Sequence, residues 1–310
     1  MDLSIIIPFY NAETTIPALL AGFPYLDRPD VEYIFINDGS EDRGKSIIED
    51  FIASHPQIEA TVINHSSNLG VSAAYADGLQ HAKGKYVTRM DADDRFLPEA
   101  FRDLVDFALT SDADIVCAPY LEQRPGKKPR LRAMVSDSLN RMPVDTPTFS
   151  LSGKLIRRSL LNDHSLTTIP GLDCWEDLFL LSRAYALAPT VVLTQSPVFV
   201  YNVDSNAPTV SRSPKSKILN DRITYATELE KWLVKENLEH KYLPFLDAVK
   251  FNAKIKFLRT PHINIRGWLA VFPEINRRVM QIKSVPLIVR IGARIISFLS
   301  PFFSAGKGNA

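Results

Sequence analysis

The sequence predicts an α/β fold, in which helices flank a mainly parallel β-sheet, followed by a helical C-terminal region. Three observations support this prediction. Short apolar runs alternate with segments of helical pattern over the first two thirds of the chain. The runs are rich in Ile, Val and Phe, which is typical of strands buried on both faces of a parallel sheet. Beyond residue 214 the pattern is helical only.

The composition is that of an ordinary folded protein. The 310 residues are 45% hydrophobic and 23% charged, so the chain can form one large domain or a domain with an appendage. The formal net charge of +1 argues neither for nor against a nucleic-acid partner, and we expect none. The first residues carry no basic leader, and no apolar run of about 18 residues occurs. We therefore expect no signal peptide, no membrane-spanning helix and a cytoplasmic location.

The first third contains four predicted strands, each followed by a helix. The strands are residues 3–7, ended by Pro8, then 31–36, 59–64 and a run that begins at residue 85. The helices are a segment that begins at residue 14, residues 41–54, a segment after Gly70 and residues 98–111. Because ligands of such sheets bind beyond the carboxyl ends of the strands, the polar residues there are expected at one rim: Tyr10, Asn11, Asp38 and Asp91.

The stretch Lys85–Arg95 is an apolar strand that runs directly into three carboxylates. In an extended backbone, residues two apart point the same way, so Asp91 and Asp93 can converge on one point. Hard oxygen ligands of this kind suit Mg²⁺ or Mn²⁺. The alternative is a solvated turn before the next helix. The common glycine-rich phosphate-binding motifs are absent, so a phosphate ligand here requires the metal.

Four segments together resemble the family 2 glycosyltransferases, which have the GT-A fold. They are residues 4–11 (SIIIPFYN), 35–42 (FINDGSED), 68–72 (NLGVS) and 90–94 (MDADD). They occur in the order and at the spacing typical of the family, and the resemblance covers roughly residues 1–212. One departure is the segment Ala74-Tyr75-Ala76, where the family often has Ala-Arg-Asn.

The resemblance implies a GT-A-like, Rossmann-type domain that binds a nucleotide-sugar donor, most simply a UDP-sugar. It places Pro8 and Tyr10 in the nucleoside pocket and gives Asp38 a hydrogen bond to the base. It places Asp91 near the ribose and assigns to Asp93 the metal, Mn²⁺ or Mg²⁺, on the diphosphate. Inversion at the anomeric carbon is likewise implied by the resemblance.

The middle of the chain continues the same alternation. Residues 113–118 form a predicted strand, and residues 151–161 a short helix. The segment 122–136 is rich in Lys and Arg and predicts a loop or irregular hairpin. It either is simply solvated or steers an anionic acceptor or membrane surface. Residues 191–193 and 198–201 are further strands.

A second acidic pair opens a helix near residue 176. Acidic residues are favourable in a first helical turn for electrostatic reasons alone. The family resemblance instead assigns Asp177 the role of general base and gives acceptor binding to Glu176 and Trp175. It also assigns to Ser211 and Arg212 a contact with the donor diphosphate, although a plain surface loop accounts for them equally.

The last third is predicted as helices over residues 217–236 and 240–258 and an amphipathic helix within 284–303. In that last helix, Ile and Phe recur every three or four residues, while Arg290 and Arg294 occupy another face. Such a helix can lie in a membrane interface, or it can pack on this protein or on a second subunit.

We therefore expect a catalytic domain over residues 1–212 and a helical region over 213–310. The expected activity is metal-dependent transfer of a hexose or N-acetylhexosamine to a glycan or lipid-linked hydroxyl in bacterial surface polysaccharide synthesis. Membrane association through residues 284–303 would be peripheral. Two alternatives stay open, a nucleotidyltransferase and a non-catalytic nucleotide-sugar-binding protein. The oligomeric state is not predicted.

Overall fold

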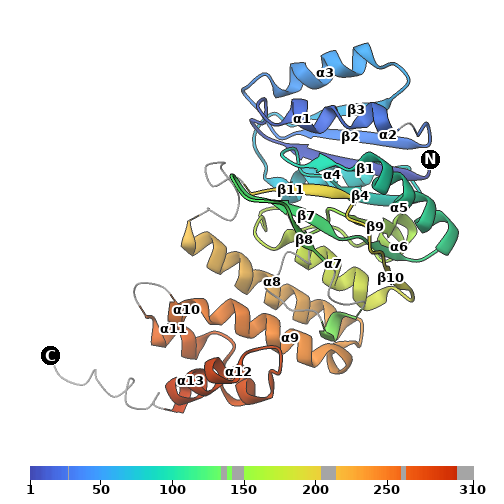
Figure 1. The fold of residues 1–310 in the computed structure, drawn as a ribbon. Coiled ribbons are helices and arrows are strands. Elements are labelled where there is room, and N and C mark those ends of the chain that lie inside the picture. The colour runs from blue at the N-terminus through green and yellow to red at the C-terminus, as the bar shows by residue number, and fades with distance from the viewer. Residues whose placement is uncertain (27, 134–137, 142–149, 204–213, 260–262, 299–310) are drawn as a thin grey trace. The chain divides into compact units, whose positions relative to one another are not determined.

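The computed structural model describes residues 1–26, 28–133, 138–141, 150–203, 214–259 and 263–298 (Figure 1). The chain divides into two compact units. The first comprises Met1–Asp137 and Thr148–Pro208, and the second Ser138–Pro147 and Thr209–Ala310. The domain boundary predicted after residue 212 falls within 204–213, outside the described residues, and stays a prediction.

A seven-stranded sheet forms the centre of the first unit. In spatial order its strands are β10 (Val191–Leu193), β6 (Ile115–Cys117), β9 (Lys154–Arg157), β4 (Tyr86–Arg89), β1 (Leu3–Phe9), β2 (Val31–Asn37) and β3 (Glu59–Asn64). All neighbours pair in parallel except β9, which is antiparallel to both β4 and β6. The predicted α/β class with a mainly parallel sheet is confirmed.

Helices cover both faces of this sheet (Figure 1). Those of the first unit are α1 (Ile16–Leu20), α2 (Phe23–Leu26), α3 (Gly44–Ser54), α4 (Val71–His81), α5 (Pro98–Ser111), α6 (Arg158–Asp163) and α7 (Glu176–Leu187). The odd-numbered residues of β1 face a core built with α1, α2, α3 and α5. On the opposite face, Gly78 of α4 lies directly against Ile6, and Tyr185 of α7 lies 2.9 Å from Cys117.

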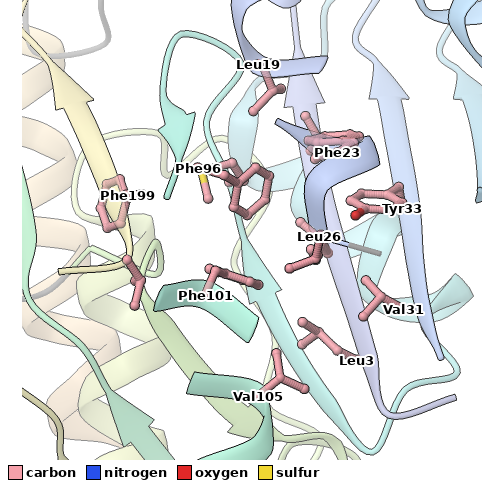
Figure 2. Close-up of a cluster of buried hydrophobic side chains, with 14 of the residues drawn as sticks. Leu3, Leu19, Phe23, Leu26, Val31, Tyr33, Phe96, Phe101, Val105 and Phe199 are labelled. Atoms are coloured by element: carbon pink, nitrogen blue, oxygen red, sulfur yellow. The ribbon is translucent and has the colours of Figure 1, made fainter. Parts of the chain in front are cut away.

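Aromatic rings dominate the core on the first of these faces (Figure 2). Phe23 stacks on Tyr33 with ring centroids 4.2 Å apart and meets Phe96 edge-on at 5.3 Å. Phe101 of α5 meets Phe96 in the same way at 4.7 Å. Such pairs add about 1 kcal/mol each to the area that they bury, so this face forms a rigid base for the loops at the sheet edge.

A smaller sheet in the first unit has the order β5 (Arg95–Phe96), β11 (Phe199–Asn202), β7 (Tyr120–Gln123) and β8 (Arg130–Arg132). β7 and β8 pair antiparallel, so part of the basic segment is a hairpin. The buried carboxylate of Glu122 pairs with Arg124 and with Arg132, at 2.7 Å in each case. Two of the five cations in this segment therefore share one carboxylate within the hairpin.

Two predicted elements need correction. The first strand does not end at Pro8 but continues to Phe9, because the missing N–H of proline is tolerated near a strand end. Residues 151–161 are not one helix: Lys154–Arg157 form β9, and α6 begins at Arg158. The four residues of β9 are too few to show a period, and pairing with two neighbouring strands decides their conformation.

The second unit is helical in its described residues. It contains η1 (Leu139–Arg141), α8 (Lys215–Lys235), α9 (Glu239–Lys254), α10 (Lys256–Arg259), α11 (Ile265–Ala270), α12 (Pro273–Arg278), η4 (Val279–Gln281) and α13 (Leu287–Phe298). Two buried lysines of α9 are fully engaged. Lys250 binds Glu230 and Glu274, at 2.6 and 2.7 Å, and Lys254 binds the side chain of Asn276 at 2.7 Å. No helix in the described part of the chain is long and apolar enough to cross a bilayer.

Candidate functional site

The loops that follow β1 and β2 hold one another through the polar residues of the sequence motifs. The side chain of Asn11 accepts a hydrogen bond from the Glu41 amide at 2.9 Å, and Ser40 Oγ accepts one from the Asn11 amide at 3.1 Å. Asn37 accepts from the Ser40 amide at 2.9 Å. Gly39 has φ +72°, and a Cβ there would lie 2.5 Å from the backbone of Ser67. These motif residues therefore build the rim of the sheet and fix its shape.

Asp38 is buried at this rim and is already engaged by the protein. Its carboxylate accepts hydrogen bonds from the amides of Leu69 and Gly70, both at 2.9 Å, and from His65 Nδ1 at 2.7 Å. A carboxylate offers about four acceptor positions, so one is left for a ligand. The resemblance gives Asp38 the donor base, and this assignment stays a prediction.

His65 joins Asp38 to a second carboxylate. Its Nε2 lies 3.1 Å from Asp77 of α4, so both ring nitrogens face carboxylates and both can donate only when the imidazole is charged. Burial lowers the pKa of His65, but the hydrogen bonds to Asp38 and Asp77 outweigh it, and the net pKa is raised above 6.5. Sequence patterns could not indicate this residue, because its partners lie 27 and 12 residues away.

The two residues assigned to the nucleoside pocket on β1 differ in exposure. Pro8 is half-buried within the strand, whereas Tyr10 follows it and is 48% exposed. A tyrosine ring that is this open at a rigid rim can present its face to a flat ligand such as a base.

Three carboxylates follow β4, as the sequence predicts. Burial and the negative charge of Asp91 raise the pKa of Asp93 to about 6. Asp94 is fully buried, and burial with the charges of Asp91 and Asp93 raises its pKa well above the ordinary value. Asn202 of β11 holds this turn through hydrogen bonds with the Asp93 carbonyl at 2.7 Å and Asp94 at 3.2 Å. The turn is thus fixed, and the charge of Arg89, which lowers the pKa of Asp93 and Asp94, does not offset the effect of burial and of the neighbouring carboxylates.

The second acidic pair lies at the start of α7. Trp175 occupies the N-cap position with a left-handed backbone, φ +76°, and Glu176 and Asp177 form the first turn. Burial raises the pKa of Asp177, Arg89 and Lys154 lower it, and Asp91 raises it further. Asp177 therefore lies within the electrostatic field of Asp91, although 86 residues separate them in sequence.

Arg89, the last residue of β4, links the two acidic groups. Its Nε donates to Asp91 Oδ1 at 2.8 Å, and its Nη1 donates to Glu176 Oε1 at 2.8 Å. Arg89 and Lys154 are two cations that the sequence interpretation overlooked. Arg89 could have been found, because it lies two residues before Asp91 in an extended strand and so points the same way. Lys154 belongs to β9, which was predicted as helix, and gave no such signal.

The acidic residues offer the oxygen ligands that a divalent cation prefers, but they do not form a complete set of ligands by themselves. No group of three or more His, Cys, Asp or Glu side chains is placed to hold a metal within the described residues. However, Asp94 Oδ2 is buried without a hydrogen-bond partner. Burial and the charge of Asp91 raise the pKa of Asp93, and a cation bound there would favour its charged form. Magnesium-type sites commonly use one or two carboxylates and take the remaining ligands from phosphate and water.

The structure thus brings Asp91, Asp93, Glu176 and Asp177 into one electrostatically coupled group and places Tyr10 and Asp38 at the rim of the same sheet. Ser211 and Arg212, assigned to the diphosphate, lie outside the described residues. Tyr75, where the family often has arginine, is fully buried on α4. Burial raises the pKa of Tyr75, the charge of Arg89 lowers it, and the charge of Asp177 raises it further.

Comparison with known proteins agrees with this geometry. Residues 4–165, more than half of the chain, match the model of glycosyl transferase family 2. The chain belongs to this family. The uncharacterized glycosyltransferase YibD of Escherichia coli K12 is 34% identical over 36% of this chain and 32% of its own length. The glycosyltransferase EpsH of Bacillus subtilis is 24% identical over 79% of this chain and 73% of its own. A bactoprenol glucosyl transferase of Shigella phage SfV is 35% identical over 30% of this chain and 31% of its own length.

This family 2 chain therefore spans only about a third of the length of several relatives that it matches. Two solved structures share its fold. Staphylococcus aureus TarS 1-349 in complex with UDP-GlcNAc has a TM-score of 0.67 at 17% identity, over 98% of this chain and 92% of that one. The mannosyltransferase PcManGT of Pyrobaculum calidifontis, in complex with GDP-Man and Mn²⁺, has a TM-score of 0.54 at 16% identity. The match covers 97% of this chain and 82% of that one.

Proposed function

We propose that the chain is a metal-dependent, inverting glycosyltransferase that moves a sugar from a nucleotide sugar to a hydroxyl group. One observation carries the proposal: Arg89 joins Asp91, which follows a parallel strand, to Glu176, next to the assigned base Asp177. Carboxylates expected on the donor side and on the acceptor side thus form one hydrogen-bonded network through the buried guanidinium of Arg89. Membership of family 2 agrees with this arrangement.

Asp177 is the proposed general base. An acceptor hydroxyl is a weak nucleophile until its proton is removed, and a carboxylate within about 3 Å can remove it as attack proceeds. The new bond to the anomeric carbon forms as the bond from that carbon to the diphosphate oxygen breaks, and the proton passes to Asp177. A single displacement of this kind inverts the anomeric configuration.

Asp93 is the proposed metal ligand, and Asp91 is proposed to contact the ribose. When bound, Mn²⁺ or Mg²⁺ supplies the positive charge that stabilises a departing nucleoside diphosphate. Tyr10 and Pro8 are proposed to line the nucleoside pocket, with Asp38 at the base. Glu176 and Trp175 are proposed to contact the acceptor, and Ser211 and Arg212 the diphosphate.

The donor is proposed to be a UDP-hexose or UDP-N-acetylhexosamine, which the UDP-GlcNAc complex of TarS supports. The GDP-Man complex of PcManGT shows that this fold also accepts another base. The acceptor is proposed to be a glycan or lipid-linked hydroxyl in the synthesis of a bacterial surface polysaccharide, and the phage bactoprenol glucosyl transferase supports the lipid-linked form.

Incubation with UDP-, GDP- and dTDP-sugars tests the proposal. Release of nucleoside diphosphate from one donor, dependent on Mn²⁺ or Mg²⁺ and abolished by EDTA, is the expected result. Release of pyrophosphate from a nucleoside triphosphate would identify a nucleotidyltransferase instead. Binding of UDP with Mn²⁺ by calorimetry, without turnover on a panel of acceptors, would identify a binding protein.

We also propose that α13 holds the chain at the cytoplasmic face of a membrane. Leu287, Ile291 and Ile295 are exposed, and Ile288 and Phe298 are 80% and 77% exposed. No acidic residue follows Glu274 in the sequence, so anionic lipid would meet little repulsion. Sedimentation with vesicles that contain a third phosphatidylglycerol, compared for the full chain and a chain truncated after Ser284, tests this. Equal sedimentation of both would contradict it.

A further inference from the structure

Arg89 is a buried cation in a position that the proposed mechanism does not by itself require. It ends β4, its side chain is 8% exposed, and it lies on the sheet face that α4 and α7 cover. A buried guanidinium is costly unless carboxylates neutralise it. Here two carboxylates do so, and they belong to different parts of the proposed site.

The two contacts differ in how the chain provides them. Asp91 lies two residues after Arg89, so the extended backbone itself directs both side chains the same way. The guanidinium spans that carboxylate, with Nε–Oδ1 at 2.8 Å and Nη2–Oδ2 at 3.4 Å. Glu176 lies 87 residues away and reaches the remaining nitrogen, Nη1, at 2.8 Å. Each nitrogen of the planar group is therefore directed to a carboxylate oxygen.

This geometry requires arginine. The planar fork presents donors in fixed directions, whereas a lysine ammonium is a compact point charge on a flexible stem and cannot make the two-point contact with Asp91 while also reaching Glu176. Within the described residues, Arg89 is the one side chain hydrogen-bonded to both Asp91 and Glu176. A hydrogen bond thus joins the first turn of the helix that carries Asp177 to the end of β4.

We propose that Arg89 is a positioning residue that couples the donor side of the site to the acceptor side, by holding Asp91 for the donor ribose and Glu176 beside the base. This inference rests on the proposed function and extends it. It also separates the roles of the two aspartates: Asp91 is committed to the guanidinium, and Asp93 is left for the cation.

The first test measures nucleotide affinity and turnover in Arg89→Lys and Arg89→Gln. Calorimetry gives the Kd for UDP with Mn²⁺, and donor hydrolysis gives kcat and KM. We expect Arg89→Lys to weaken nucleotide binding and to lower kcat by about 10- to 100-fold each, as for residues that orient binding groups. A residue that matters for stability alone would lower the active fraction and leave Kd and KM unchanged.

Arg157→Lys is the matched control. Arg157 also lies in the large sheet and also pairs with two aspartates, Asp112 at 3.0 Å and Asp114 at 3.2 Å. It is next to Tyr86, at the opposite end of β4 from Arg89. We expect its Kd and kcat to stay within twofold of wild type.

The second test does not depend on how well the Arg89 variants fold. Coupling predicts that Glu176→Gln, although on the acceptor side, weakens the binding of UDP with Mn²⁺ by about threefold to tenfold, because the guanidinium loses one anchor. In the Arg89→Lys background the same substitution should add little. If Glu176→Gln lowers turnover but leaves the nucleotide Kd within twofold of wild type, Arg89 does not couple the two sides.

The outcomes separate this inference from the proposed function. Wild-type protein that binds and hydrolyses a nucleotide sugar, with Arg89→Lys equal to wild type, overturns the role of Arg89 alone. Wild-type protein that neither binds UDP with Mn²⁺ nor hydrolyses any donor overturns the proposed function, and this inference with it.

Discussion

Two acidic centres at the edge of the same sheet differ in how the protein treats their charge. The carboxylate of Asp38 accepts hydrogen bonds from two backbone amides and from a histidine, so its charge is compensated by the chain itself. The second centre contains the five carboxylates after β4 and at the start of α7, and two cations, Arg89 and Lys154, lie near them. The pKa is raised for four of these carboxylates: Asp93, Asp94, Glu176 and Asp177.

The difference separates structural from reactive acids. A carboxylate whose acceptor positions are filled stabilises the fold, and its removal leaves buried donors unsatisfied. A cluster whose charge is left uncompensated destabilises the fold until a cation or substrate arrives, and it is retained for function. Substitutions in the two centres should therefore change stability in opposite directions.

The largest expected effect is on catalysis by Asp177. Asp177→Asn keeps the shape of the side chain but removes the proposed base, so kcat should fall by roughly 10²- to 10⁴-fold while the Kd for UDP with Mn²⁺ stays within about threefold. Stopped or continuous assays of nucleoside diphosphate release measure it. The control is Asp163→Asn, an exposed aspartate at the end of α6, which should match wild type. Wild-type turnover by Asp177→Asn would refute the assignment.

The next largest effect is expected for Asp93→Asn, which should weaken nucleotide binding but increase stability. Asp93→Asn should weaken the binding of UDP with Mn²⁺ at least about 10-fold, because the proposed metal ligand is lost. The same change removes repulsion from Asp91, so we expect the protein without metal to gain on the order of 1 kcal/mol in free energy of unfolding, measured in urea with EDTA. A loss of stability would show that the charge of Asp93 is compensated within the protein.

The opposite sign is expected at Asp38. Asp38→Asn places an amide N–H₂ among three donors, from His65, Leu69 and Gly70, and should cost about 2 kcal/mol of stability under the same urea conditions. Comparison with Asp93→Asn tests the contrast directly. A stability loss below about 0.5 kcal/mol for Asp38→Asn would mean that the amides find other partners, such as water.

The alternation of strands and helices predicted the sheet whose edge carries the acidic residues. The convergence of Asp91 and Asp93 was predicted for an extended backbone and stays a prediction, because β4 ends at Arg89 and the Asp94 amide donates to the Asp91 carbonyl at 3.1 Å, which makes residues 91–94 a turn. The period of two in an extended strand would have drawn attention to Arg89. Its partner Glu176, however, lies 87 residues away, and only the folded structure shows that they meet.

What could not be predicted depends on distant packing. The short strand β9 has apolar residues at Leu155 and Ile156 that face opposite sides of the sheet, and this pattern is equally compatible with a helix. Its misassignment concealed Lys154 as a cation of the site. The hydrogen bonding of Asp38 was also hidden, because two of its donors are backbone amides of a loop 31 and 32 residues further along.

The smallest expected effect is a pH dependence of stability from His65. Burial lowers the folded-state pKa of His65, but Asp38 and Asp77 raise it, and the net value lies above 6.5. The contribution of the charged imidazole to the free energy of unfolding is therefore complete below about pH 6.5 and is lost as the pH rises through the folded-state pKa. Urea denaturation from pH 6 to 8.5 should show wild type losing on the order of 1 kcal/mol more than His65→Gln. His81→Gln, at the exposed end of α4, should follow wild type. Parallel curves for wild type and His65→Gln would mean that the charged imidazole does not hold the two carboxylates, and that the Asp38 centre is compensated by backbone amides alone.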